Sequence, residues 1–361
     1  MKKAILWISA LVIVLSLSAC DTTKEPPVEV PEEPVINVPQ TPTDDVSTPD
    51  SDEVDVVDPT NEEQPEDNDK EVVLIKLNEE QAMDAYQTMR DRMENESPVD
   101  IYEDMMTLLP QMPENIGAIQ FAKFEQYMQN WAMNYSDQMY FEDGPMSNLW
   151  KSIDQAYDYE TDSYDFDKME NITHAEITKS LFKSGFKFIW LEGSPYPFID
   201  YAQFKSLGDL VPEEVMAFIL IMAEESDQIS SADAGLVISW NELASRAVKT
   251  ESALKIVENP ELHAKLESIY RFYAGAYMLG MNNTPVVNWE DNKLQPTVLE
   301  SYESTMANHA GSELSKMIEK YMNALKKLDF VLPYSNQEQF QAIVKLQSDW
   351  IEEATENLHK H

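Results

Sequence analysis

The chain of 361 residues has a single cysteine, Cys20, and only nine glycines. One cysteine cannot form an internal disulfide, so the packing of apolar side chains must hold the fold together. Few glycines argue against folds that alternate strands and helices through glycine-rich turns, and no glycine-rich phosphate loop is present. The G-x-S-x-G and H-E-x-x-H patterns of hydrolases are missing too. The scarcity of glycine favours a helical fold. Because the sequence contains no strong catalytic or phosphate-binding motif, we predict no cofactor.

Basic residues are also scarce, because 26 Lys and Arg stand against 66 Asp and Glu and give a formal net charge of -40. Such a surface repels nucleic acid and anionic lipid headgroups, so neither is an expected partner. A cation or a basic protein would be attracted instead. We expect most of this charge to keep the protein soluble.

The N-terminus has the layout of a secretory signal peptide. Lys2 and Lys3 precede an apolar run from Ala4 to Leu17, and small residues lead into Cys20. The run is shorter than the roughly 20 residues of a membrane-spanning helix. The sequence Leu17-Ser18-Ala19-Cys20 resembles the lipobox of bacterial lipoproteins.

That resemblance implies that residues 1–19 are removed and that the thiol of Cys20 carries diacylglycerol. Acyl chains such as palmitate would then anchor the protein on the extracytoplasmic face of the cell membrane. The alternative is an uncleaved N-terminal anchor, with Cys20 present by chance.

Residues 20–71 have the composition of a disordered tether. Between residues 21 and 71 there are 18 acidic residues, two lysines and nine prolines, with no glycine and no aromatic residue. Such a segment buries too little apolar surface to offset its ordering entropy. Proline stiffness and charge repulsion would extend it to about 150 Å at most. A spacer of this kind fits a Gram-positive cell envelope best.

Residues 72–361 predict an all-α domain, an irregular multi-helix bundle in which pairs of helices could stack. Met, Ala, Leu, Glu, Gln and Lys are abundant, and these residues favour helices. Asn78, Thr173 and Ser335 are candidate helix caps, each followed three residues later by Glu or Gln. Whether the segment is one domain or two subdomains stays open. Only Val72 to Leu77 offers a plausible strand.

Apolar residues at three- and four-residue steps mark the individual helices. One stripe runs from Ile116 to Tyr135, and another from Phe340 to Leu358. The expected helices span about 80–94, 99–109, 146–158, 174–190, 212–227, 231–248, 260–280, 296–309, 312–328 and 336–358.

Two segments interrupt this helical pattern. Trp190–Tyr201 contains Gly193, Pro195 and Pro197, so we expect an ordered aromatic loop between two helices. The segment Gly280–Pro285 predicts a helix end followed by a turn. Both could be structural corners, filled by apolar packing in one case and by asparagine turn chemistry in the other.

We place a ligand site where these two segments approach each other, because rigid irregular loops often carry binding residues. Carboxylates, amides and aromatic rings together suit a polyhydroxyl or peptide ligand, such as a cell-wall glycan or peptide, or an envelope protein. The candidate ligand-binding residues are Glu192, Tyr196, Asp200, Tyr201, Glu225, Glu251, Asn282 and Asn283.

Metal-binding patterns fail in this sequence. The acidic run that starts at Asp158 has Ser163 and Met169 where a calcium loop needs glycine and glutamate, so a solvated connection is expected. His174, His263 and His309 are scattered and predicted to lie at the surface or at helix ends. His359 and His361 lie near the C-terminus, where fraying is expected. We therefore predict no metal site.

The sequence favours a lipid-anchored, extracytoplasmic binding or scaffold protein with an unknown ligand. One alternative is an enzyme, because Glu225-Ser226 followed by Ala234-Gly235-Leu236 resembles a fragment of the lytic transglycosylase pattern. That resemblance implies a general-acid role for Glu225, although Val237-Ile238 stands where the family has Met-Gln. A solute-binding lipoprotein of a transporter is the other alternative, and the scarcity of strands argues against it.

Overall fold

The structure is a computed structural model that describes residues 75–141 and 144–359. The predicted signal peptide, Cys20 and the acidic tether lie outside these residues, as does the start of the predicted strand at Val72. The described remainder of that strand, Ile75–Leu77, is not a strand. Instead, the amide of Leu77 donates to the carbonyl of Gln111 at 2.8 Å.

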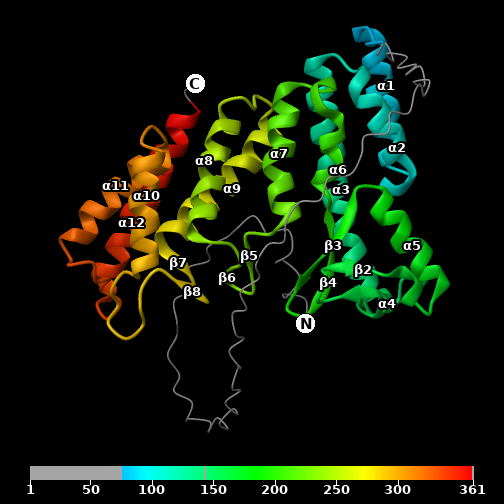
Figure 1. Cartoon of the computed structure of the whole chain (residues 1–361). Coiled ribbons are helices and arrows are strands. Elements are labelled where there is room, and N and C mark those ends of the chain that lie inside the picture. Colours follow the sequence, from blue (N-terminus) through cyan, green and yellow to red (C-terminus); the bar gives the residue numbers. More distant parts are fainter. Residues whose placement is uncertain (1–74, 142–143, 360–361) are drawn as a thin grey trace, which may run out of the picture. The chain divides into compact units, whose positions relative to one another are not determined.

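The fold is all-α, an irregular multi-helix bundle, as the sequence predicts (Figure 1). The sequence predicts both the first and the last residue of ten helices, and eight of these helices begin and end within three residues of the observed bounds. The apolar stripe from Ile116 to Tyr135 lies inside α3. The α-helices of the described residues are α1 (Glu79–Met93), α2 (Pro98–Leu108), α3 (Glu114–Phe141), α4 (Leu149–Ala156), α5 (Ile172–Lys183), α6 (Tyr201–Phe204), α7 (Glu213–Asp227), α8 (Trp240–Leu254), α9 (Pro260–Leu279), α10 (Pro296–Asn308), α11 (Glu313–Lys326) and α12 (Gln337–Leu358).

Local capping explains where several of these helices begin. The side chain of Asn78 accepts from the amide of Gln81, whose own side chain accepts from the Asn78 amide, so the predicted capping box is present. The caps predicted at Thr173 and Ser335 are wrong by one or two residues. Asn171 caps α5 and Asn336 caps α12, because asparagine oxygens reach the free amides there.

The helix predicted over 174–190 is wrong beyond Lys183. Two residues later, Gly185 has φ +78°, a left-handed conformation that a helix cannot contain. A Cβ at this position would lie 2.5 Å from the ring of Tyr102. The chain then forms strands β3 (Phe186–Leu191) and β4 (Ser194–Ile199), which pair antiparallel. The expected aromatic loop is therefore a hairpin, and its two turn residues both have positive φ.

The helix predicted over 231–248 is also wrong in its first half. Strands β5 (Ser231–Ala232) and β6 (Gly235–Leu236) form a short hairpin, and α8 begins only after Ser239, whose hydroxyl caps it. Similar two-residue strands make two more hairpins: β1 (Tyr157–Asp158) with β2 (Ser163–Tyr164), and β7 (Gly280–Met281) with β8 (Thr284–Pro285). A helix followed by a hairpin thus occurs four times in the described residues, after α4, α5, α7 and α9.

Helix α9 is central to the packing, since it contacts α7, α8, α11 and α12. Its side chains Tyr270, Tyr273 and Tyr277 are all buried within a continuous apolar core. Such burial of aromatic surface is the main stabilising contribution expected in a chain without disulfides. Among the described helices, none combines the length and apolar character needed to cross a membrane.

Candidate functional site

A cavity of about 370 Å³ opens between four elements, α3, β4, α7 and α9, with Tyr201 of α6 at its wall. Its size falls within the range of small-molecule sites, roughly 300–1,000 Å³. Apolar side chains make up most of its wall. The lining residues are Gln129, Ala132, Met133, Pro197, Phe198, Ile199, Tyr201, Met222, Glu225, Ser230, Ala264, Lys265, Ser268, Ile269, Phe272 and Tyr273.

One polar group in this wall is built around Lys265 of α9. Its ammonium forms an ion pair with Glu125 of α3 and donates to Oε1 of Gln129 at 3.2 Å. The hydroxyl of Tyr201 donates to Glu125 Oε1 at 2.6 Å. Glu125 and Gln129 are four residues apart on α3, so both side chains lie on the face that meets α9.

Burial changes the protonation of this group. It lowers the pKa of the Lys265 ammonium to about 8 and raises the pKa of the Tyr201 hydroxyl well above its usual value. Lys265 therefore exchanges its proton much closer to neutral pH than an exposed lysine does. Shifted pKa values are common at functional sites, so Lys265 makes this cavity a candidate site.

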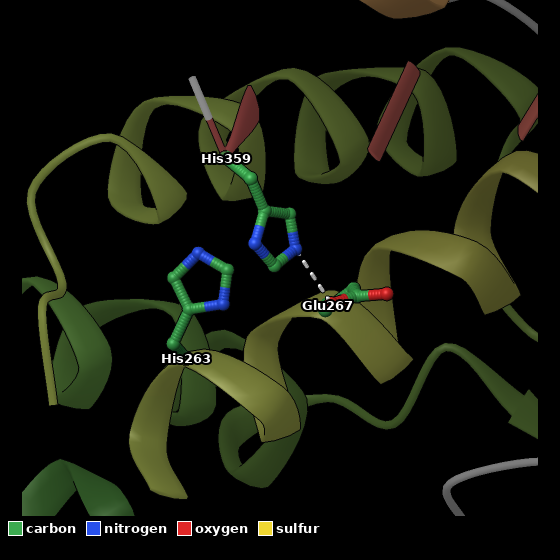
Figure 2. A group of neighbouring side chains, drawn as sticks. All are labelled: His263, Glu267 and His359. Carbon is green, nitrogen blue, oxygen red and sulfur yellow. Dashed lines mark hydrogen bonds and ion pairs between the residues drawn. The ribbon is translucent and has the colours of Figure 1, made fainter. Parts of the chain in front are cut away.

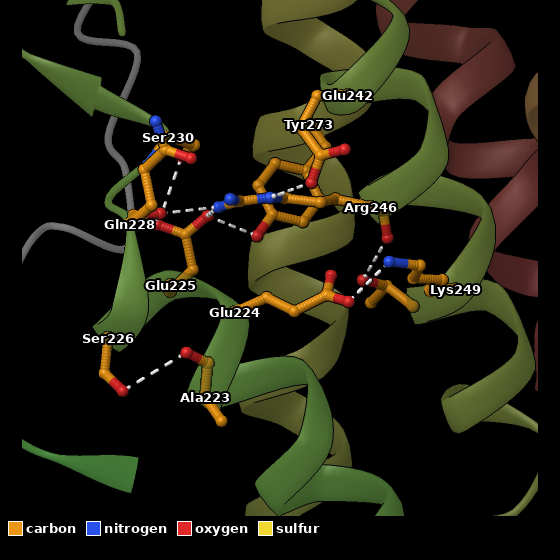
Figure 3. Close-up of polar contacts among 11 residues, drawn as sticks. Ala223, Glu224, Glu225, Ser226, Gln228, Ser230, Glu242, Arg246, Lys249 and Tyr273 are labelled. Atoms are coloured by element: carbon orange, nitrogen blue, oxygen red, sulfur yellow. Dashed lines mark hydrogen bonds and ion pairs between the residues drawn. The ribbon is translucent and has the colours of Figure 1, made fainter. Parts of the chain in front are cut away.

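A second polar group surrounds Glu225 at the last turn of α7 (Figure 3). Its Oε1 accepts from Arg246 at 2.9 Å and from the Tyr273 hydroxyl at 2.5 Å. Its Oε2 accepts from both the amide and the hydroxyl of Ser230, each at 3.1 Å. Arg246 also donates to the carbonyl of Gln228 at 2.8 Å, so the network fixes the chain between α7 and β5.

This arrangement makes Glu225 a structural carboxylate. A general acid must hold a proton and offer it to a substrate. The side chain of Glu225 is buried, and both of its oxygens accept hydrogen bonds from protein donors. The geometry therefore favours a role in ordering the cavity wall over the general-acid role implied by the transglycosylase resemblance.

The two irregular segments predicted to form the site each contact a third one. The amide of Glu192 donates to Asp233 Oδ1 at 3.0 Å, and the amide of Asn283 donates to the carbonyl of Ala234 at 2.9 Å. The β5–β6 hairpin thus links the Trp190–Tyr201 segment to the Gly280–Pro285 segment. Sequence reasoning missed this hairpin, because its two-residue strands produce no alternating pattern.

Only two of the eight predicted site residues, Tyr201 and Glu225, line the cavity. Glu192, Asn282 and Asn283 lie exposed at hairpin turns. The ring of Tyr196 packs 5.7 Å from that of Tyr140.

Asp200 and Glu251 also lie outside the cavity wall. Asp200 accepts from Gln203 at 3.0 Å and lies 3.5 Å from Lys187. The buried carboxylate of Glu251 accepts from the amides of Glu313 and Leu314 at 2.9 and 2.7 Å. Glu251 therefore binds the free amides of the first turn of α11, beside the N-cap Ser312, and takes no part in the cavity wall.

The sequence predicts the histidines at the surface or at helix ends, and His174 and His263 lie in the first turns of α5 and α9. His174 is buried, where its Nδ1 lies 2.7 Å from the Ser152 hydroxyl. His263 and Glu267 of α9 meet His359 at the end of α12 (Figure 2). Within the described residues, this is the group of three or more His, Cys, Asp or Glu side chains whose ligating atoms lie close enough to hold one metal ion.

The electrostatics of the cluster formed by His263, Glu267 and His359 differ from those of the cavity wall. Burial and the neighbouring His359 lower the pKa of His263, which favours its neutral ring. For Glu267, burial alone would raise the pKa, but hydrogen bonds from Arg271 and His359 outweigh it and lower the pKa.

No protein-family model, curated protein or solved structure matches the chain.

Proposed function

We propose that this protein is a lipid-anchored binding protein of the cell envelope, whose helical domain holds a small, largely apolar molecule with an anionic group. The single observation that carries the ligand proposal is the cavity of about 370 Å³ with Lys265 in its wall. The anchor rests on the lipobox-like sequence that ends at Cys20 and on the acidic spacer after it.

The lining supports an apolar ligand body. Met133, Met222, Ile269 and Phe272 come from three different helices and face the same space. Apolar groups that enter such a cavity gain about 25 cal/mol for each Å² removed from water. A polyhydroxyl ligand would leave many of its hydroxyls without partners there, so the cavity favours an amphiphile over the glycan expected from the two loops.

Lys265 supports an anionic group on that ligand. A lysine ammonium has three donors. Within the described part of the chain, Nζ has two acceptors, Glu125 and Gln129, which leaves one donor for a ligand. A carboxylate in this position would also gain from the low dielectric of the cavity, where charge-assisted hydrogen bonds are strong.

A titration with decanoate, an anionic ten-carbon probe, tests this function on the full chain. We expect calorimetry to show saturable binding of one decanoate, and weaker binding of the neutral decanol. Replacing Ser268, which lines the cavity, by Phe fills the space and should lower decanoate affinity at least about tenfold, the equivalent of 1.4 kcal/mol.

Ser252→Phe is the matched control. Like Ser268, Ser252 lies on a helix and its hydroxyl donates to the carbonyl four residues earlier, but it lies outside the cavity wall. Affinity should stay unchanged in this variant. Absence of binding to both probes, or equal loss in both variants, would refute the cavity as a ligand site.

A further inference from the structure

His263, Glu267 and His359 form a compact cluster at the contact between α9 and α12 (Figure 2). His263 and Glu267 lie one helical turn apart on α9, so their side chains share a face. His359 follows the last residue of α12, and its Nε2 donates to Glu267 Oε2 at 2.9 Å. The two imidazole rings have centroids 4.5 Å apart.

We infer that these three side chains form a zinc site, with two imidazole nitrogens and one carboxylate oxygen as protein ligands and water in the fourth position. One ligating atom from each residue lies within 4.8 Å of the other two. In tetrahedral coordination at zinc–ligand distances near 2.0–2.1 Å, ligand atoms are about 3.3 Å apart. Side-chain rotations therefore need to shorten each distance between two ligating atoms by about 1.5 Å at most.

Neighbouring groups already orient two of the three ligands. Arg271 donates from Nε to Glu267 Oε1 at 2.8 Å, which leaves Oε2 on the side of the histidines. His263 forms a hydrogen bond to the backbone of Leu254. Outer partners of this kind fix the ring and carboxylate orientations at metal sites.

The charge around the cluster also suits a dication. A hollow of about 400 Å³ adjoins it, lined by Glu267, Arg271, Glu352, Thr355, Glu356 and His359. Three carboxylates against one guanidinium give this hollow a negative potential, which concentrates cations. His359 is exposed, so its ring can turn toward an ion without disturbing the core.

Bound zinc would cross-link α9 to the end of α12. These helices pack against each other, and Arg271 already joins them through Glu352 at 2.7 Å and Thr355 at 2.8 Å. Zinc bound only by the folded state would stabilise that packing by mass action. The site shares no residue with the Lys265 cavity, so either proposal can fail without the other.

Calorimetric titration of the full chain with zinc chloride tests the site, using protein purified without a histidine tag. We expect one zinc ion per chain and a higher melting temperature with zinc. His263→Ala and His359→Asn should each lower zinc affinity at least about 100-fold, beyond the 10- to 100-fold typical of losing an outer partner. Circular dichroism without metal checks that each variant folds.

His361→Ala is the matched control, because His361 lies two positions after His359 and outside the described residues. It should bind zinc as the unchanged chain does. Loss of binding in this variant would assign the ion to the C-terminal histidines alone. The inference would be overturned by any of three results: loss of zinc binding in His361→Ala, zinc binding that survives His263→Ala, or no zinc binding by the unchanged chain.

Discussion

Lys265 and Glu125 form an ion pair across 140 positions of sequence, and the pair joins α9 to α3 at the wall of the largely apolar cavity. Glu125 is 2% exposed, whereas the Lys265 side chain keeps 22% of its surface accessible. The carboxylate is therefore the buried partner, and the ammonium is the one a ligand can reach. We therefore expect both the stability of the domain and ligand binding in the cavity to depend on this pair.

Removing the ammonium alone should destabilise the fold. Lys265→Met leaves the carboxylate of Glu125 buried with the Tyr201 hydroxyl as its remaining strong donor. We expect a loss of about 3 kcal/mol in the free energy of unfolding, measured by urea denaturation. Glu125→Gln combined with Lys265→Met should recover most of it, since no unpaired charge is then buried.

The exposed pair of Lys345 and Asp349 provides the control for that measurement. Its side chains are 74% and 55% accessible, so Lys345→Met should cost less than about 1 kcal/mol. Equal losses at Lys265 and Lys345 would mean that the Glu125 pair contributes no more than a surface contact.

The lowered pKa of Lys265 predicts a distinct pH dependence. Its folded pKa of about 8 lies below the unfolded value of roughly 10.4, so unfolding takes up a proton between these pH values. The unfavourable desolvation of the charged ammonium is thus fully present below pH 8, and this cost disappears as the pH rises toward 10.4. Acetylation rates mapped by mass spectrometry should show a midpoint near pH 8 for Lys265. A midpoint near 10, as expected for an exposed lysine, would contradict the burial argument.

Helix positions could be predicted from the sequence, because periodic apolar residues and caps such as Asn78 are local signals. The hairpins could not, since Asp233 and Ala234 adopt positive φ in a turn that lacks glycine at either position. Contacts with distant segments, such as the amide of Asn283 that donates to the carbonyl of Ala234, hold that hairpin instead.

Most of the contacts in the two candidate sites could not be predicted either, because they join residues that are far apart in the sequence. The contact of Lys265 with Glu125 joins two distant helices, and no local pattern marks it. His263 and Glu267 do show a one-turn spacing in the sequence, but His359 lies 92 positions after Glu267. Apolar periodicity places each helix without specifying which helices pack together.

Glu225→Gln separates a structural role from catalysis. The amide cannot accept from Arg246 and from Ser230 as the carboxylate does, so we expect a loss of about 2–4 kcal/mol in unfolding free energy. We also expect that neither the unchanged chain nor this variant releases muropeptides from purified cell walls, as measured by liquid chromatography. Release by the unchanged chain that the variant loses would identify Glu225 as a general acid.

Cys20→Ala tests the membrane anchor. Without the thiol there is no site for diacylglycerol, so the chain should stay unprocessed or appear in the medium. Cell fractionation and mass measurement of the N-terminal peptide distinguish these outcomes from the native state. A mature chain that stays with the membrane and carries no lipid would contradict the lipoprotein proposal.

The cavity between α3, β4, α7 and α9 is the proposed ligand site, and methyl resonances of labelled methionines test this proposal most directly. Met133 and Met222 line the cavity, whereas Met83 is 52% exposed on α1. Titration of the full chain with decanoate should shift the methyl signals of Met133 and Met222, assigned by Met→Leu variants, and leave Met83 unchanged. Decanoate that leaves the two cavity signals in place, or shifts all three alike, would contradict the account.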